Sequence, residues 1–77
     1  MAPPEKRLKN VTFQLEPELL RVFKALCASN GYSMRARFEQ FIMLDIAQSG
    51  TFTKDEFERC WNLASAAAEH FNPPTLK

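Results

Sequence analysis

The chain has 77 residues, which allow one domain at most. Its net charge is +1. A domain of this size buries only about 60% of its unfolded surface, so a single core is marginal and self-association would help. The longest apolar run is far short of the roughly 20 residues that span a membrane, and no secretory leader is expected. Two cysteines, Cys27 and Cys60, make no disulfide framework, which favours the reducing cytoplasm.

The small net charge conceals an asymmetry along the chain. Residues 1–37 contain seven lysines and arginines against three glutamates, a balance of +4. Residues 38–77 contain three against six acids, a balance of −3. A basic front half indicates a polyanionic partner, although a chance distribution of surface charge explains the balance equally well.

The first predicted element is a β-strand over residues 9–15. Three apolar residues alternate there with three polar ones: Val11, Phe13 and Leu15 with Asn10, Thr12 and Gln14. This period of two is typical of a strand with one apolar and one polar face. Because no other segment has the pattern, we expect the strand to pair antiparallel with the same strand of a second copy.

Two helices are predicted to follow. Glu16-Pro17 starts the first, since proline suits the first helical position, and Asn30-Gly31 ends it. Ser33 caps the second helix, and Ser49-Gly50 ends it. The interior of the second helix is apolar nearly all round, which is typical of a helix in the middle of a core.

A third helix is predicted over residues 54–71. Thr53 and Glu56 form a capping box at its start, and Pro73 follows its end. We expect its apolar side to cover the open side of the core rather than to bind a ligand: Phe57, Cys60, Trp61, Ala64, Ala68 and Phe71. Proline pairs near both ends of the chain predict flexible tails outside the fold.

Several features of residues 8–47 occur in one order: the alternating strand, the acid–proline helix start, Leu19-Leu20-x-x-Phe23-x-x-Leu26, the Asn30-Gly31 turn, Ser33 with Ala36, and Phe38 with Ile42. In that order they resemble the ribbon-helix-helix family of bacterial, archaeal and phage DNA-binding proteins. The resemblance implies a mainly α fold, an intertwined homodimer with an intermolecular two-stranded antiparallel ribbon, plus an additional C-terminal helix. The implied parts are a flexible basic arm (1–8), the DNA-binding core (9–50), the additional helix (51–72) and a tail (73–77).

The resemblance also implies which residues contact DNA. Base contacts fall on alternate residues of the exposed strand face, here Asn10, Thr12 and Gln14. Asn and Gln can pair with adenine and Thr with thymine in the major groove, although an ordinary solvated strand face explains the three residues equally well. Phosphate contacts are expected at the start of the second helix and from basic residues nearby or before the strand: Lys6, Arg7, Ser33, Met34, Arg35 and Arg37.

The sequence therefore predicts a sequence-specific transcriptional repressor, cytoplasmic and nucleoid-associated, that places a dimeric ribbon in the major groove of double-stranded DNA. Dimers can then pair on DNA. Partition and conjugation accessory proteins and antitoxins with the same fold stay open, with residues 54–71 available to a protein partner. A helical protein-interaction module without nucleic-acid binding is the alternative from another class. No catalytic, metal or cofactor motif surrounds the lone His70, so we expect no enzyme, no metal, no cofactor and no membrane partner.

Overall fold

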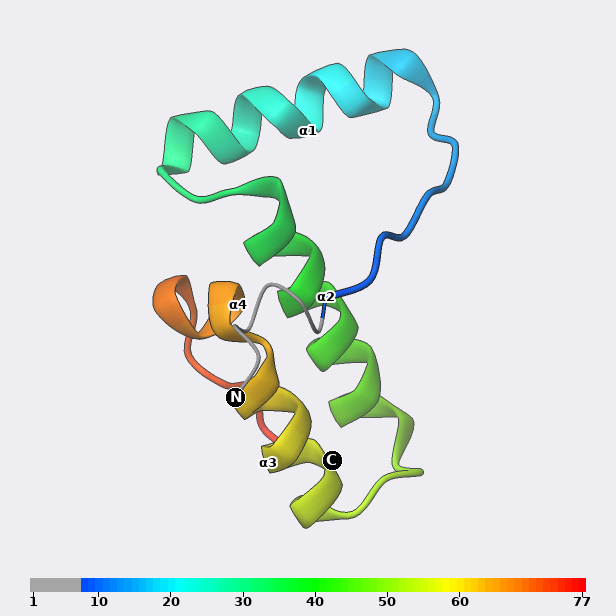
Figure 1. Ribbon diagram of the computed structural model, residues 1–77, viewed down its shortest axis with the longest axis vertical. Coiled ribbons are helices and arrows are strands. Elements are labelled where there is room, and N and C mark those ends of the chain that lie inside the picture. The colour runs from blue at the N-terminus through cyan, green and yellow to red at the C-terminus, as the bar shows by residue number, and fades with distance from the viewer. Residues whose placement is uncertain (1–7) are drawn as a thin grey trace.

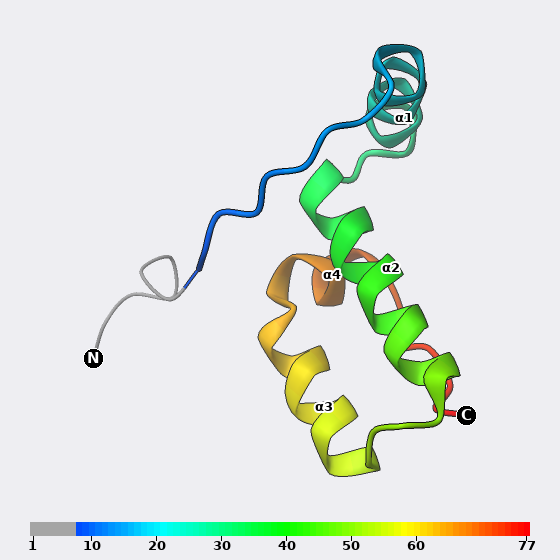
Figure 2. The same ribbon diagram turned by 90° about the vertical axis from the view of Figure 1, so that its right-hand side faces the viewer.

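The computed structural model describes residues 8–77. An N-terminal segment, residues 8–15, precedes four helices: α1 (Pro17–Asn30), α2 (Met34–Ser49), α3 (Lys54–Leu63) and α4 (Ser65–His70). Figure 1 shows α1 lying across the top of α2, with α3 and α4 beside α2. Figure 2 shows the N-terminal segment as a trace without helix that runs from the start of α1 past α2.

The predicted β-strand over residues 9–15 is wrong, because the described residues form helices and no strand. A strand exists only through hydrogen bonds to a neighbouring strand, and no second strand occurs between residues 8 and 77. The alternation of apolar and polar residues therefore specifies a segment with two chemically different sides, but no sheet. The two-stranded ribbon and the intertwined ribbon-helix-helix dimer built on it are wrong with it, whereas the mainly α class is confirmed.

Local capping sets the predicted helix boundaries. Three side-chain oxygens each accept a hydrogen bond from the amide three residues later: Glu16 from Leu19 (2.9 Å), Ser33 from Ala36 (3.0 Å) and Thr53 from Glu56 (3.1 Å). Each bond satisfies an amide that has no partner within its helix. Gly31 and Gly50 end α1 and α2 with φ of 76° and 71°, a left-handed conformation that suits glycine. The predicted starts and ends of α1 and α2 are confirmed.

The predicted helix over residues 54–71 is two helices. Ala64, with φ of −82° and ψ of 63°, leaves the helical conformation and separates α3 from α4. Its amide still donates to the carbonyls of Cys60 and Trp61, so the chain bends without losing that bond. The bend lets α4 turn toward α2, and Ala67 becomes fully buried there.

The main core lies between α2 and the two C-terminal helices. Its buried members are Met43, Ala47, Phe57, Ala64 and Ala67, and four half-buried residues pack against them: Ile46, Trp61, Phe71 and Leu76. Three of the five buried members are alanines, which allows α4 to approach α2 closely.

Residues 73–77, expected to be a tail outside the fold, instead pack on this core. Leu76 contacts the core, and the amide of Lys77 donates to the carbonyl of Ala47 at 2.9 Å. The predicted arm at the other end, with Lys6 and Arg7, lies outside the described residues apart from Leu8. Across residues 8–77, no helix combines the length and the apolar character needed to cross a membrane.

Candidate nucleic-acid interface

A cluster of phenylalanines holds the N-terminal segment and α1 against α2. The ring of Phe38 in α2 lies 5.5 Å from Phe13, edge-on at 89°, and 5.1 Å from Phe23 in α1. Phe23 also lies 6.4 Å from Phe41. Edge-on and tilted pairs at such distances are favourable for aromatic rings. Phe13 therefore packs the N-terminal segment against α2.

A groove of about 770 Å³ opens between the N-terminal segment, α1 and the first half of α2. Asn10 and Thr12, two of the three predicted base contacts, line it. Met34 and Arg35, two of the predicted phosphate contacts, line the same groove from the start of α2. The structure thus brings four predicted residues from two distant segments together. Gln14 is exposed but does not line the groove.

The start of α2 offers backbone donors to this groove. The first amides of a helix have no partner within the helix, and they lie at the positive end of its dipole. The hydroxyl of Ser33 satisfies the amide of Ala36, which leaves the amides of Met34 and Arg35 outside the helical bonding pattern. These two amides are suited to an anion such as a phosphate oxygen.

Arg35 is an exposed cation at the groove. Its Nε lies 3.4 Å from a carboxylate oxygen of Glu39, and its side chain remains 47% exposed. The other oxygen of Glu39 accepts a hydrogen bond from the amide of Ala67 in α4 at 3.2 Å. Glu39 therefore links the groove to α4. Sequence analysis missed this role, although the spacing of four residues between Arg35 and Glu39 was a signal for the pair.

Lys9 is a second groove residue that was not predicted as a contact. It lines the groove beside Asn10 and is exposed. In a strand, Lys9 would lie on the same side as Val11 and Phe13 and project at the fraying end. Without a sheet, Lys9 adds positive charge to the same wall as the polar side chains.

Arg37 points away from the groove. Its guanidinium carbon lies 4.3 Å from the centre of the Phe41 ring and 5.7 Å from that of Phe71. The guanidinium also donates to the side-chain oxygen of Gln40, and Nε is buried without a partner. These contacts tie α2 to the end of α4. A phosphate contact by Arg37 stays a prediction, and it would compete with both rings.

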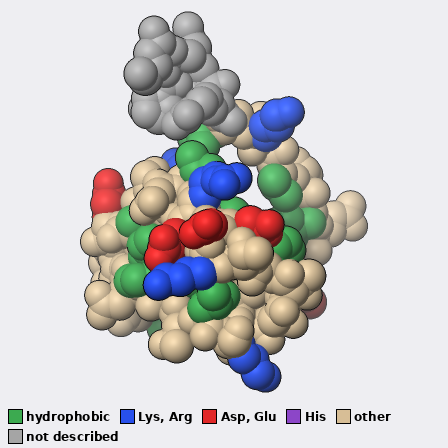
Figure 3. Space-filling view, turned by 90° about the horizontal axis from the view of Figure 1, so that it is seen from below, with side chains coloured by type: hydrophobic (Ala, Val, Ile, Leu, Met, Phe, Trp, Pro, Cys, Tyr) green, Lys and Arg blue, Asp and Glu red, His purple; other side chains and the backbone are tan. Residues whose placement is uncertain are grey.

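Charges elsewhere are mixed. Figure 3 shows the lower end of the molecule in Figure 1, where acidic and basic side chains lie next to one another. On α1, Arg21 Nε donates to Glu18 at 3.1 Å, and this bond holds the pKa of the Glu18 carboxyl below its ordinary value. The described residues hold no group of three potential metal ligands, and Cys27 and Cys60 are both free thiols.

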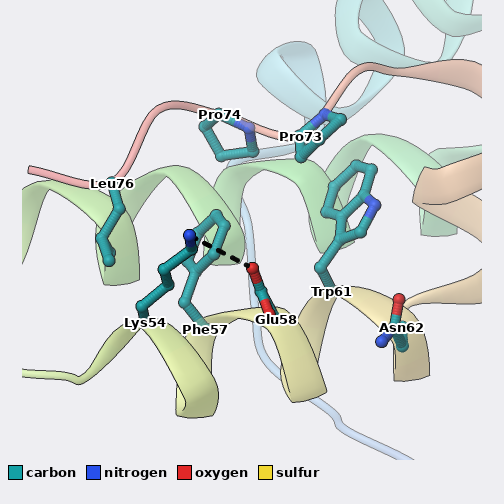
Figure 4. A pocket seen from close by; sticks show the side chains of 8 residues that line it. All are labelled: Lys54, Phe57, Glu58, Trp61, Asn62, Pro73, Pro74 and Leu76. Carbon is teal, nitrogen blue, oxygen red and sulfur yellow. Dashed lines mark ion pairs between the residues drawn. The ribbon is translucent and has the colours of Figure 1, made fainter.

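A second hollow, of about 490 Å³, lies between α3 and the C-terminal residues. In Figure 4, Trp61 extends from α3 toward Pro73, and Lys54 forms an ion pair with Glu58 at 4.0 Å. None of the predicted DNA contacts lines this hollow. It belongs to the packing of the C-terminal residues on α3.

Comparison with known proteins gives no match: no family model, curated protein or solved structure is similar to this chain. The resemblance to the ribbon-helix-helix family therefore stays a prediction from the motifs. The functional argument rests on the residues that line the groove.

Proposed function

We propose that this protein is a sequence-specific DNA-binding protein that acts as a homodimer and represses transcription in the cytoplasm of a prokaryotic cell. The observation that carries the proposal is the groove in which Lys9, Asn10 and Thr12 lie opposite Met34 and Arg35. It combines the two chemistries that duplex recognition needs, namely cationic and amide donors for phosphates and neutral polar side chains for base edges.

The roles divide by chemistry. Arg35, Lys9 and the free amides at the start of α2 hold the phosphate backbone, which sets the position of the protein on the duplex. Asn10 and Thr12 then reach base edges, with Gln14 adjoining them on the exposed segment. A single extended segment carries these side chains. The three contain no arginine, so adenine-rich sites are expected rather than guanine-rich ones.

The apolar residues around the groove support the homodimer. Nine large apolar side chains, here called the N-terminal apolar surface, are exposed by 39% to 78%: Leu8, Val11, Phe13, Leu15, Leu19, Val22, Leu26, Phe41 and Ile42. The accessible surface of the chain is 6248 Å² over 77 residues, or about 80 Å² per residue, so nine exposed apolar residues present on the order of 700–800 Å². A standard protein interface buries about 800 Å² on each partner. Five of the nine side chains line the groove together with Lys9, Asn10 and Thr12, so the proposal places the second copy directly beside the residues that contact DNA.

Selection of bound sites from a random duplex pool tests the proposal and supplies the preferred sequence. On the selected site, the triple variant N10A/T12A/Q14A is expected to lose specific binding while keeping its helicity, since each good bidentate contact contributes about 1–3 kcal/mol of discrimination. Unchanged affinity of the triple variant for the selected site would remove the base contacts.

The phosphate contact is tested separately. Arg35→Ala is expected to weaken binding to selected and random duplexes alike and to reduce the salt-dependence slope by about one unit. Lys54→Ala is the matched control, because Lys54 lies on α3 away from the groove. If R35A and K54A give the same slope as the unmodified protein, Arg35 does not touch phosphate.

One alternative is favoured by a specific observation. The same N-terminal apolar surface suits a helical module that binds another protein and no nucleic acid. Under this alternative, random duplex at low salt gives no mobility shift at any protein concentration. The use of the same DNA contacts in plasmid partition, in conjugation or by an antitoxin is distinguished by the neighbouring genes.

A further inference from the structure

A third hollow, of about 240 Å³, lies on the flank of the molecule between α2 and α3. Its lining is mostly apolar: Glu39, Ile42, Met43, Ile46, Cys60, Leu63 and Ala64. Ile42 on α2 and Leu63 on α3 are each 58% exposed. Exposed apolar side chains of this size on both sides of one hollow indicate a surface that a partner covers.

This hollow continues the groove described above. Glu39 and Ile42 line both of them. Along α2, Phe38, Ile42 and Ile46 follow at intervals of four residues, so they form one row on one side of the helix. The N-terminal apolar surface therefore extends along this row to Leu63 at the end of α3.

The one acid that lines the hollow, Glu39, already has partners in the single chain. The carboxylate of Glu39 is already engaged by Arg35 at 3.4 Å and by the amide of Ala67 at 3.2 Å. Its side chain is only 21% exposed. Because each carboxylate oxygen already has a partner, covering Glu39 leaves neither oxygen without one.

We infer that the α2–α3 flank, defined by Ile42, Ile46 and Leu63, is buried against a second copy of this chain. The inference rests on the proposed homodimer and extends its interface to α3. With Leu63 added, the exposed apolar area per copy is about that of a standard interface, roughly 800 Å² on each partner. The C-terminal residues cannot cover the flank, since Pro73, Pro74 and Leu76 lie over Phe57 and Trp61 in the 490 Å³ hollow.

Sedimentation equilibrium of the full chain without DNA tests the inference. Leu63→Lys is expected to raise the dimer dissociation constant at least about 30-fold, because a two-fold interface loses the contact twice. Phe52→Lys is the matched control: Phe52 is 45% exposed, and it lines neither the groove nor the flank. Leu63→Met should keep the dissociation constant of the unmodified chain within about threefold, since the volume is conserved.

The possible outcomes separate this inference from the homodimer itself. If Leu63→Lys dimerises like Phe52→Lys while Leu19→Lys does not dimerise, the dimer stands and α3 lies outside its interface, which overturns the inference. If the unmodified chain is a monomer at every concentration, the dimer and the inference both fall. Circular dichroism checks that each variant keeps its helicity. If Leu63→Lys loses helicity, Leu63→Gln replaces it, provided that Leu63→Gln keeps the helicity of the unmodified chain. Its dimer dissociation constant then decides whether Leu63 lies in the interface.

Discussion

The two halves of the chain contrast in where their apolar side chains lie. Around α3, α4 and the second half of α2, Met43, Ala47 and Phe57 are buried at 2%, 0% and 6% exposure. In the segment before α1 and on α1 itself, Val11 is 78% and Leu19 60% exposed. Both halves are rich in apolar residues. Apolar content alone therefore does not decide where a core forms; each apolar face also needs an opposing face within reach of the same chain.

The arrangement of the helices explains the contrast. The short connection between α2 and α3 brings α3 and α4 back along α2, which gives α2 a partner for one side (Figure 1). In α1, Phe23 contacts the α2 rings and Cys27 is buried. The adjoining part of its apolar face stays exposed, namely Leu19, Val22 and Leu26. The apolar face of α1 is thus wider than the surface that α2 offers to it.

Breaking the C-terminal core should have the largest effect on folding. Phe57→Ala is expected to lower the free energy of unfolding by about 3–5 kcal/mol, since it empties a buried aromatic site. Chemical denaturation followed by the fluorescence of Trp61, which packs on this core, measures the loss. Phe52→Ala, at an exposed phenylalanine, should change it by no more than about 0.5 kcal/mol. Equal effects from the two variants would contradict the contrast between buried and exposed phenylalanines.

Changing the N-terminal half should affect association instead of folding. Leu19→Ser is expected to leave the helicity unchanged and to raise the dimer dissociation constant about 10-fold or more, since it removes one exposed leucine from each copy. Ala25→Ser on the same helix is the matched control for the loss of helix propensity. A large fall in the melting temperature of dilute Leu19→Ser, where the chain is monomeric, would show that Leu19 supports the single chain.

Removing the hydrogen bond between Glu39 in α2 and the amide of Ala67 in α4 should have the smallest effect on stability. Glu39→Ala removes the acceptor for the Ala67 amide at the start of α4, a helix without a capping side chain of its own. The expected loss is about 1 kcal/mol, as for other helix caps. Amide hydrogen exchange at Ala67 measures it. Glu39→Gln keeps an acceptor oxygen and should restore most of the protection, and equal exchange in the two variants would contradict the cap.

Local features of the fold were predictable from the sequence, and pairing between distant segments was not. The caps at Ser33 and Thr53 act within three residues, so sequence alone identified them. The strand over residues 9–15 failed because alternation describes the sides of a segment and says nothing about a neighbour to pair with. The break at Ala64 has no local signal in an alanine-rich stretch, and it follows from the packing of α4 on α2.

The candidate site was predictable only in part, because local spacing identifies residues but not the distant segments that surround them. Asn10, Thr12, Met34 and Arg35 were identified from the motif, and they meet in one groove. Arg37 was assigned by its place at the start of the second helix, but its guanidinium lies over the ring of Phe71 near the far end of the chain. Side chains whose surroundings come from distant segments cannot be oriented by local spacing.

The claim that the N-terminal half is completed by a second copy is tested most directly by sedimentation velocity of the unmodified chain without DNA. The account predicts twice the mass of a single chain at micromolar concentration, with dissociation on dilution. A single species of one chain at all concentrations, with its helicity intact, would contradict it.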